Sequence, residues 1–181
     1  MGKRRSYTVK RRYPYARTTQ RLPMPYRPHI FADNPLDRGD RQRRDDAWLE
    51  ERAGDRGSRF LVMPGLEVPL SDGPTPSLRW LDADDLDRFA VDGPRVFLGL
   101  QDGTAHFAVF VPGTDGAAKE LRSDPSMAFS DARAAATVLT GQETGIVSQA
   151  RAQLDWHNRH GFCSVCGTPT EMGRGGHVRR C

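Results

Sequence analysis

Three cysteines near the carboxyl end are the residues whose type and spacing best suit chemistry in this sequence of 181 residues. Cys163 and Cys166 are separated by two residues and followed directly by Gly167, and 14 residues lie between Cys166 and Cys181. Two thiolates at the first spacing can bind one metal ion from a tight turn, and the glycine lets backbone N–H groups approach sulfur. An odd number of clustered cysteines is unlike a secreted disulfide scaffold and indicates a reducing compartment. We therefore predict a cytoplasmic protein with a structural zinc site whose ligands are Cys163, Cys166 and Cys181.

The fourth ligand of this zinc site is left open by the sequence. A second Cys-x-x-Cys pair commonly follows the first after about 15–20 residues, but here the sequence ends at Cys181. Either the sequence is a piece of a longer protein, or the fourth ligand is His177, His160 or the terminal carboxylate. His177 would need an unusual bend to reach the metal, so we expect it to pack on the second arm of the site. We expect His157 and His160 to form hydrogen bonds beside the zinc site and to support a thiolate. A closed site of this kind contributes folding energy and no catalysis.

Charge is distributed unevenly along the chain. Residues 1–32 hold nine Lys or Arg and no Asp or Glu, whereas the remainder has 18 basic and 23 acidic residues. We predict that residues 1–32 form a disordered, solvated basic tail. The alternatives are an arm that binds RNA or a membrane surface through phosphate groups, and a mitochondrial presequence, for which the prolines leave little room. No apolar run reaches the roughly 18 residues of a transmembrane helix, and no apolar segment follows the first basic residues as in a secretory signal.

Short apolar runs separated by turn residues characterise residues 33–127. The sequence RVFLGL-QDG-TAHFAVFV predicts a β-hairpin in which Gly103 takes positive φ. A helix is predicted over 41–53 and a short helix over 81–89, where the carboxylates of Asp82 to Asp87 form a solvated face and no metal site. The expected strands are Phe60–Met63, Leu66–Leu70, Leu78–Leu81, Val96–Leu100 and His106–Val111.

Residues 128–160 have a helical pattern and predict a helical connector. Alanines favour a first helix, and Thr140-Gly-Gln-Glu143 fits a capping box that begins a second. Apolar residues recur in that second helix every three or four positions, which predicts one buried stripe. The fold class is therefore α+β, with a small N-terminal α/β domain over 33–127, this connector, and an incomplete metal-binding segment over 161–181. The stripe consists of Ile146, Ala150, Leu154 and His157.

The sequence LDWHNRHGFCSVCGTPT over residues 154–170, followed by Gly175-Gly176 and Arg179-Arg180-Cys181, closely resembles the zinc-ribbon region of NADH pyrophosphatases of the Nudix hydrolase superfamily. Those proteins carry Trp-His-x-x-His-x-Phe-Cys-x-x-Cys-Gly, then a Gly-Gly stretch and a second cysteine pair. Upstream residues, from about 30, resemble more loosely the family's degenerate Nudix-like N-terminal domain. The resemblance implies a homodimeric hydrolase that cleaves NADH or NAD to nicotinamide mononucleotide and AMP. Some members remove NAD caps from RNA.

The resemblance also implies catalysis by a downstream Nudix box, G-x5-E-x7-R-E-U-x-E-E-x-G-U, whose glutamates hold Mg²⁺ or Mn²⁺. The six glutamates of this chain do not form that arrangement, so no catalytic residue is carried over. We expect the chain to be the N-terminal portion of such an enzyme and to be inactive by itself. The alternative, from a different class, is a non-catalytic zinc-ribbon module whose basic arm binds nucleic acid or protein. The glutamates are Glu50, Glu51, Glu67, Glu120, Glu143 and Glu171.

Overall fold

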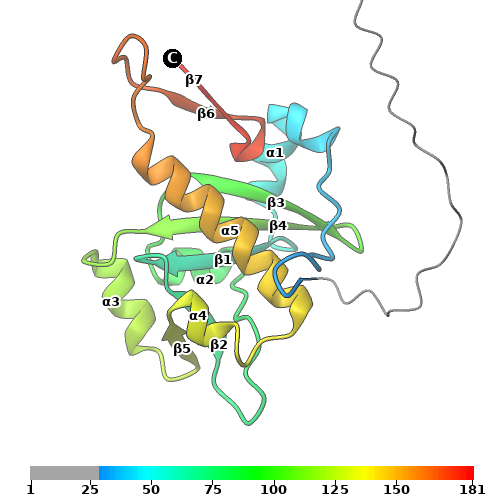
Figure 1. Cartoon of the computed structure of the whole chain (residues 1–181). Helices are drawn as coiled ribbons and strands as arrows, with labels where there is room; N and C mark the ends of the chain where they lie inside the picture. Colours follow the sequence, from blue (N-terminus) through cyan, green and yellow to red (C-terminus); the bar gives the residue numbers. More distant parts are fainter. Residues whose placement is uncertain (1–28) are drawn as a thin grey trace, which may run out of the picture.

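A three-stranded sheet in the order β1-β4-β3 forms the centre of the fold in the computed structural model, which describes residues 29–181 (Figure 1). Strand β1 (Arg59–Pro64) runs parallel to β4 (Thr104–Val111), and β4 pairs with β3 (Arg95–Gln101) in antiparallel register. Helices and strands are mixed along the chain, so the predicted α+β class is confirmed. Residues 1–28, which hold most of the tail predicted over 1–32, lie outside the described residues.

The hairpin predicted from the alternating apolar runs is confirmed as β3 and β4. Gln101 pairs with Thr104, so the loop consists of Asp102 and Gly103, whose φ values are 51° and 81°. Positive φ at both loop positions matches the right-handed twist of the two strands, and glycine adopts it without strain. The turn residues therefore set the register that places alternate side chains of β3 and β4 on opposite faces.

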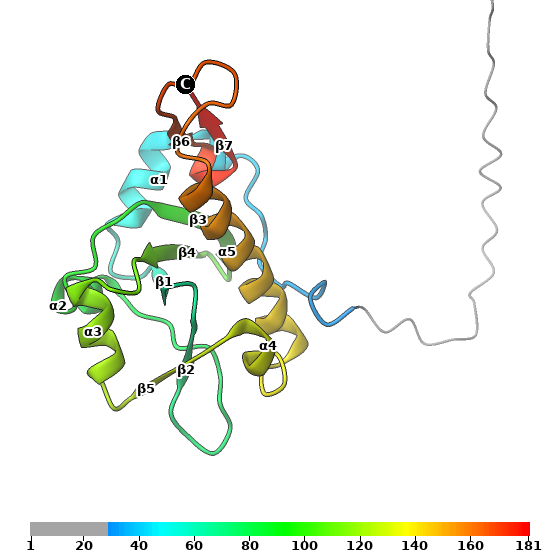
Figure 2. The ribbon, with the colours of Figure 1, turned by 60° about the vertical axis from the view of Figure 1, so that its left-hand side comes forward.

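Each face of the sheet has its own hydrophobic cluster. Helix α5 (Gly141–Arg159) crosses one face and runs towards the C-terminal segment, as Figures 1 and 2 show from two sides. Helices α1 (Asp46–Ala53), α2 (Ala83–Arg88) and α3 (Gly116–Ser123) pack on the other cluster. Burying one large apolar side chain contributes about 1.5–3 kcal/mol, so tertiary packing stabilises these short helices. The α5 face includes Leu61, Met63, Val96, Leu98, Ile146, Ala150 and Leu154.

Helix α5 begins at the capping box that the sequence predicts. The Thr140 hydroxyl accepts a hydrogen bond from the Glu143 N–H at 3.2 Å, and the Glu143 carboxylate accepts one from the Thr140 N–H at 3.0 Å. The buried stripe is confirmed for its three apolar members, which are at most 4% exposed. His157, the fourth member, is only half-buried and lies where the helix leaves the sheet. The short helix α4 (Ala132–Ala135) precedes α5.

The early helical segment is divided in two. A 3-10 turn, η1 (Gln42–Arg44), is followed by α1, because Asp45 interrupts the helical backbone and accepts the Trp48 N–H at 3.0 Å as an N-cap. The short helix predicted over 81–89 is confirmed as α2, with a capping box between Asp82 and Asp85. These acidic side chains therefore cap a helix, as well as lining its solvated face.

Helix α3 and strand β5 (Met127–Ser130) are not predicted by the sequence analysis. Helix α3 is only eight residues long and begins at Asp115, whose carboxylate accepts the Ala117 N–H at 3.2 Å. Strand β5 pairs antiparallel with the distant β2 (Val68–Ser71). Residues 128–130, which we expect to begin a helical connector, are thus extended. Short elements that pair over a long sequence separation leave little periodic pattern.

The strand expected at Leu78–Leu81 does not form. This segment makes only isolated bridges, from Leu78 to Leu70 and from Leu81 to Phe60. Both leucines are buried, so the apolar pattern reports burial and not a continuous strand. Within residues 29–181, no helix has the length and apolar composition that crossing a bilayer requires.

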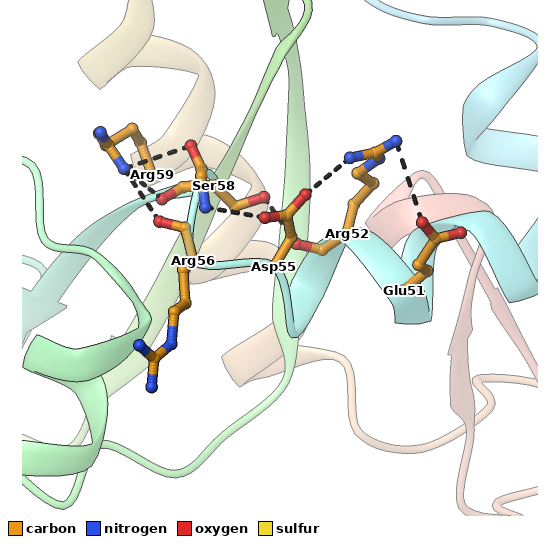
Figure 3. Close-up of polar contacts among 7 residues, drawn as sticks. Glu51, Arg52, Asp55, Arg56, Ser58 and Arg59 are labelled. Carbon is orange, nitrogen blue, oxygen red and sulfur yellow. Dashed lines mark hydrogen bonds and ion pairs between the residues drawn. The ribbon is translucent and has the colours of Figure 1, made fainter.

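The turn between α1 and β1 is organised by Asp55 (Figure 3). Its carboxylate accepts the Gly57 N–H at 2.8 Å and forms an ion pair with Arg52 at 2.6 Å. The Ser58 hydroxyl donates to the Arg52 carbonyl at 2.6 Å. The hydrogen bond from Gly57, followed by that from Arg52, lowers the pKa of Asp55 below its ordinary value. This turn fixes the direction in which β1 enters the sheet.

Candidate metal centre

Residues 162–170 fold into a tight loop that carries Cys163 and Cys166. The Cys163 N–H donates to the Thr168 carbonyl at 2.8 Å, and the Gly167 N–H donates to the Cys163 carbonyl at 2.9 Å. Gly167 has a φ of 71°, which glycine adopts without strain. Backbone N–H groups of the loop, above all that of Cys166, donate to the Cys163 sulfur and lower the pKa of its thiol. The sequence thus folds locally into a turn that presents both thiols with N–H groups behind them.

A second hairpin brings the last cysteine back to this loop. It consists of β6 (Glu171–Gly173), the 3-10 turn η2 (Arg174–Gly176) and β7 (Val178–Arg180). Because Glu171 pairs with Arg180, the next residue, Cys181, lies beside the start of β6 and hence beside the loop. The three cysteine sulfurs all lie within 4.8 Å of one another. The structure therefore brings together all three residues that the sequence singles out.

The electrostatics of the three thiols favour a cation between them. The Thr168 hydroxyl, 3.3 Å from the Cys166 sulfur, stabilises the thiolate and lowers the pKa of Cys166 to about 7. Cys181 has a raised pKa, because its thiol donates hydrogen bonds to Cys163 first and Cys166 second. Three thiolates at this separation repel one another unless a positive charge lies among them. A bound metal ion removes that repulsion and lets all three ionise.

Zinc is the metal that these residues fit. Zn–S bonds of about 2.3 Å in a tetrahedral site place ligand sulfurs about 3.8 Å apart, which is within the 4.8 Å that bounds the distances in this cluster. Thiolate is a soft ligand that suits zinc, whereas Mg²⁺ and Ca²⁺ prefer oxygen. Backbone N–H groups directed at sulfur are the usual surroundings of a structural zinc thiolate. The cluster is thus suited to holding a metal, which would bind all three thiolates as ligands.

None of the histidines that we considered as ligands joins the three sulfurs. His160 Nδ1 lies 2.9 Å from the Trp156 carbonyl oxygen, within its own helical turn. His177 is exposed, and its backbone N–H closes η2 by donating to the Arg174 carbonyl at 3.3 Å. The expectation that His157 and His160 support a thiolate is wrong, because both form their hydrogen bonds with other groups. The His157 bond connects α5 to the cysteine segment, whereas the His160 bond stays within the end of α5.

His157 and Arg179 connect α5 to the cysteine segment. His157 Nε2 lies 2.8 Å from the Gly176 carbonyl oxygen, and its Nδ1 lies 2.8 Å from Arg179 Nη1. Because Arg179 can only donate, Nδ1 must accept and Nε2 must carry the proton. Arg179 also donates through Nε to the Thr170 hydroxyl at 2.6 Å and through Nη2 to the Thr170 carbonyl at 2.8 Å. Sequence reasoning missed Arg179 and Thr170, since their partners are distant in sequence.

Two glycines let the cysteine segment approach the sheet closely. Gly175 and Gly176 are buried and have φ values of 58° and 92°. A Cβ on Gly175 would lie 2.9 Å from Phe97 Cβ, and one on Gly176 would lie 2.8 Å from Val96 Cγ1. No other residue fits there without strain, because both the space and the backbone conformation require glycine. The Gly-Gly stretch therefore lets η2 pack directly against β3.

Comparison with known families agrees with this geometry. Residues 57–156, more than half of the chain, match the model of the NADH pyrophosphatase-like rudimentary NUDIX domain. The chain belongs to this family. Residues 158–181 match the NADH pyrophosphatase zinc ribbon domain. The sheet with its helices is thus the rudimentary NUDIX domain, and the cysteine segment is the zinc ribbon, which together with the sulfur cluster indicates zinc binding.

Curated relatives match over short segments. The chain is 46% identical over 43 residues to the NAD-capped RNA hydrolase NUDT12 of Homo sapiens and equally to that of Macaca fascicularis. This segment is 24% of the chain and 9% of each relative. It is 34% identical over 62 residues to the mitochondrial NAD(P)H pyrophosphatase NUDT13 of Homo sapiens, which is 34% of the chain and 18% of that relative. The matched segments thus span less than a fifth of these proteins.

The contact between the zinc ribbon and α5 has a measurable protonation signature. Burial, followed by the nearby charge of Arg179, lowers the pKa of His157 below its ordinary value of 6.5. The titratable groups that act on it are Arg179 on β7 and His177 after η2, and neither is acidic. We expect NMR titration of the imidazole to give a pKa below 6.5 and nitrogen shifts of the Nε2–H tautomer.

The same shift gives the sign of the pH dependence. The unfolded state binds more protons than the folded state between the folded pKa and 6.5, so His157 lowers stability as the pH falls through that range. Protonation of the thiolates in acid also weakens zinc binding, so a measurement of stability against pH would mix the two effects. NMR titration of the His157 ring separates them. An Nδ1–H tautomer would contradict the hydrogen bonds described above, and a His157 pKa at or above 6.5 would contradict the burial of the ring beside Arg179.

Proposed function

We propose that this chain is the zinc-stabilised N-terminal part of a NAD(H) pyrophosphatase of the Nudix superfamily, and that it does not hydrolyse pyrophosphates by itself. Its membership of the rudimentary NUDIX family, followed directly by a matching zinc ribbon, supports the first half of the proposal. The substrate class follows the activities of the relatives, which are an NAD-capped RNA hydrolase and an NAD(P)H pyrophosphatase. The proposed products are nicotinamide mononucleotide and AMP.

One observation carries the second half of the proposal. Among residues 29–181, the three cysteines form the only group of three or more His, Cys, Asp or Glu side chains placed to hold a metal ion. Binding Mg²⁺ or Mn²⁺ at a pyrophosphate needs several carboxylates in one place. Two of the six glutamates have structural roles: the Glu143 carboxylate caps α5, and Glu67 forms an ion pair with Arg122 at 2.6 Å. The described residues therefore do not fit a catalytic Mg²⁺ or Mn²⁺, and in this proposal further sequence supplies the ligands.

The zinc ligands in this proposal are Cys163, Cys166 and Cys181. Zinc bound there would fix the loop of the first two against the end of β7, because it cross-links segments separated by 14 residues. Supporting observations are the mutual distances within 4.8 Å and the lowered pKa values of the first two thiols. The fourth ligand is proposed to come from outside the described residues or from water. Homodimerisation and a cytoplasmic location complete the proposal.

The alternative of a nucleic-acid-binding module gains no support from the described residues. Its main argument is the basic segment over 1–32, most of which lies outside them. We therefore retain the hydrolase assignment for the gene product.

Zinc content and hydrolysis together test the proposal. We expect the purified protein to contain one zinc ion per chain and to release no AMP from NADH in the presence of Mg²⁺ or Mn²⁺. Chromatography of the nucleotides and elemental analysis of the protein provide both readouts. A Glu143→Gln variant is the matched control for any residual activity, because Glu143 belongs to a helix cap. AMP release far above the rate without protein would overturn the proposal that this chain is inactive by itself. A purified protein without zinc would overturn the zinc assignment.

A further inference from the structure

A cavity of about 390 Å³ lies where the zinc ribbon meets the NUDIX domain. Ligand sites in proteins commonly have volumes of about 300–1,000 Å³, with mainly apolar walls and a few polar groups. Here the sheet, helix α5 and the ribbon each supply part of the wall, so the cavity exists only while the ribbon is docked. The wall includes Val96, Phe110, Leu154, Met172, Asn158 and Arg179.

Arg179 brings to this cavity a positive charge that forms no ion pair with a described residue. Its three hydrogen bonds go to neutral acceptors, namely the hydroxyl and carbonyl of Thr170 and the ring of His157. No carboxylate of the described residues lies within ion-pair distance of Arg179. A guanidinium has five N–H donors, so two remain for a ligand. A half-buried cation with free donors attracts a carboxylate or a phosphate.

One acidic residue, Glu171, also lines the cavity. Its side chain is exposed, and it stands opposite Arg180 in the β6–β7 register. Solvent and the neighbouring guanidinium therefore screen its charge, whereas Arg179 is partly withdrawn from solvent. The apolar part of the wall contains the ring of Phe110 and the thioether of Met172. Both groups pack favourably against a flat aromatic ring.

We propose that this cavity is a ligand site for an aromatic ring that carries a negatively charged group, with the charge bound by Arg179. An aryl carboxylate and a nucleoside monophosphate share this chemistry. This proposal does not depend on the proposed hydrolase function. Because its walls come from both parts of the protein, an occupant stabilises the docked arrangement of ribbon and NUDIX domain.

Calorimetric titration of the zinc-loaded protein tests this site with four probes. Nicotinate and AMP carry the charge, whereas nicotinamide and adenosine are their neutral counterparts. We expect at least one of the two anions to bind about tenfold or more tightly than its neutral counterpart, as loss of a charge-assisted hydrogen bond predicts. Binding of nicotinate alone would identify an aryl carboxylate as the ligand class, and binding of AMP alone would identify a nucleoside monophosphate. Failure of both anions to bind, or equal binding of the neutral probes, would overturn the proposal.

Variants locate the binding. Arg179→Gln is expected to weaken anion binding about tenfold or more, but it also removes contacts that hold the ribbon. Asn158→Trp provides the second route, because Asn158 is exposed, lines the cavity and forms no side-chain hydrogen bond with another described residue. The indole fills the cavity and should abolish binding. Arg151→Gln, the same charge change on the exposed side of α5 and outside the lining, should leave it intact. Unchanged affinity in Asn158→Trp would contradict the site, whatever the protein's hydrolytic activity.

Discussion

Replacing Cys166 by alanine is expected to reduce zinc affinity more than about 100-fold. Loss of an outer-shell contact typically costs about 10–100-fold, and this variant loses a ligand. The thiolate is removed outright, and the remaining two sulfurs leave half of a tetrahedral site without protein ligands. Since zinc binding is coupled to folding of the segment that supplies the ligands, residues 162–181 should lose their order as well. Competition with a chromophoric chelator measures the affinity, and amide hydrogen exchange measures the order.

Ser164→Ala is the matched control for this prediction, because Ser164 is exposed between the two cysteines and is not part of the cluster. The NUDIX domain should remain folded in both variants. Its two hydrophobic clusters draw their buried members from residues 36–154, and only Met172 of the ribbon packs against them. Full zinc content in Cys166→Ala would show that the zinc ion binds at another place in the protein.

Gly176→Ala is expected to destabilise the docked ribbon by about 2–5 kcal/mol, combining backbone strain with overpacking. The new Cβ would lie 2.8 Å from Val96 Cγ1, and the backbone φ of 92° disfavours any side chain. Val96 is 1% exposed and belongs to the sheet, so it cannot move aside. Hydrogen exchange should therefore rise over β6 and β7 and at the end of α5, while exchange in the sheet stays slow.

Two further glycine variants separate the causes. Gly167 has a φ of 71° with nothing within 4 Å of an added Cβ, so Gly167→Ala measures backbone strain alone. Gly161 has neither positive φ nor a near neighbour, and Gly161→Ala should be close to neutral. An effect of Gly176→Ala no larger than that of Gly161→Ala would contradict the close approach of η2 to β3.

Local signals in the sequence were sufficient for the elements that depend on local structure. The two-residue turn at Asp102 and Gly103, the capping box at Thr140 and the spacing of the first two cysteines each involve neighbours in the chain, and each predicts its element correctly. Strand β5 depends on pairing with β2 across more than fifty residues, and the sequence does not reveal it.

The contacts that dock the ribbon could not be predicted for the same reason. His157 and Arg179 are 22 residues apart, and their hydrogen bond exists only when β7 folds back towards α5. A His three residues before another His suggests metal ligation or support of a ligand, yet the tertiary fold gives these side chains backbone partners. Gly175 and Gly176 are visible in the sequence as a motif, but their contacts with Phe97 and Val96 follow from the packing of distant segments.

Helix α5 serves both halves of the molecule, since its middle turns pack on the sheet and its last turn bonds to the ribbon. An α-helix turns by about 100° and rises about 1.5 Å for every residue. Inserting or deleting a single residue between Leu154 and His157 would therefore rotate the imidazole by about 100° around the helix axis. The apolar residues of α5 would keep their packing on the sheet. The number of residues between Leu154 and His157 therefore fixes the direction in which His157 leaves the helix. Insertions and deletions there should be tolerated far less than substitutions at exposed positions.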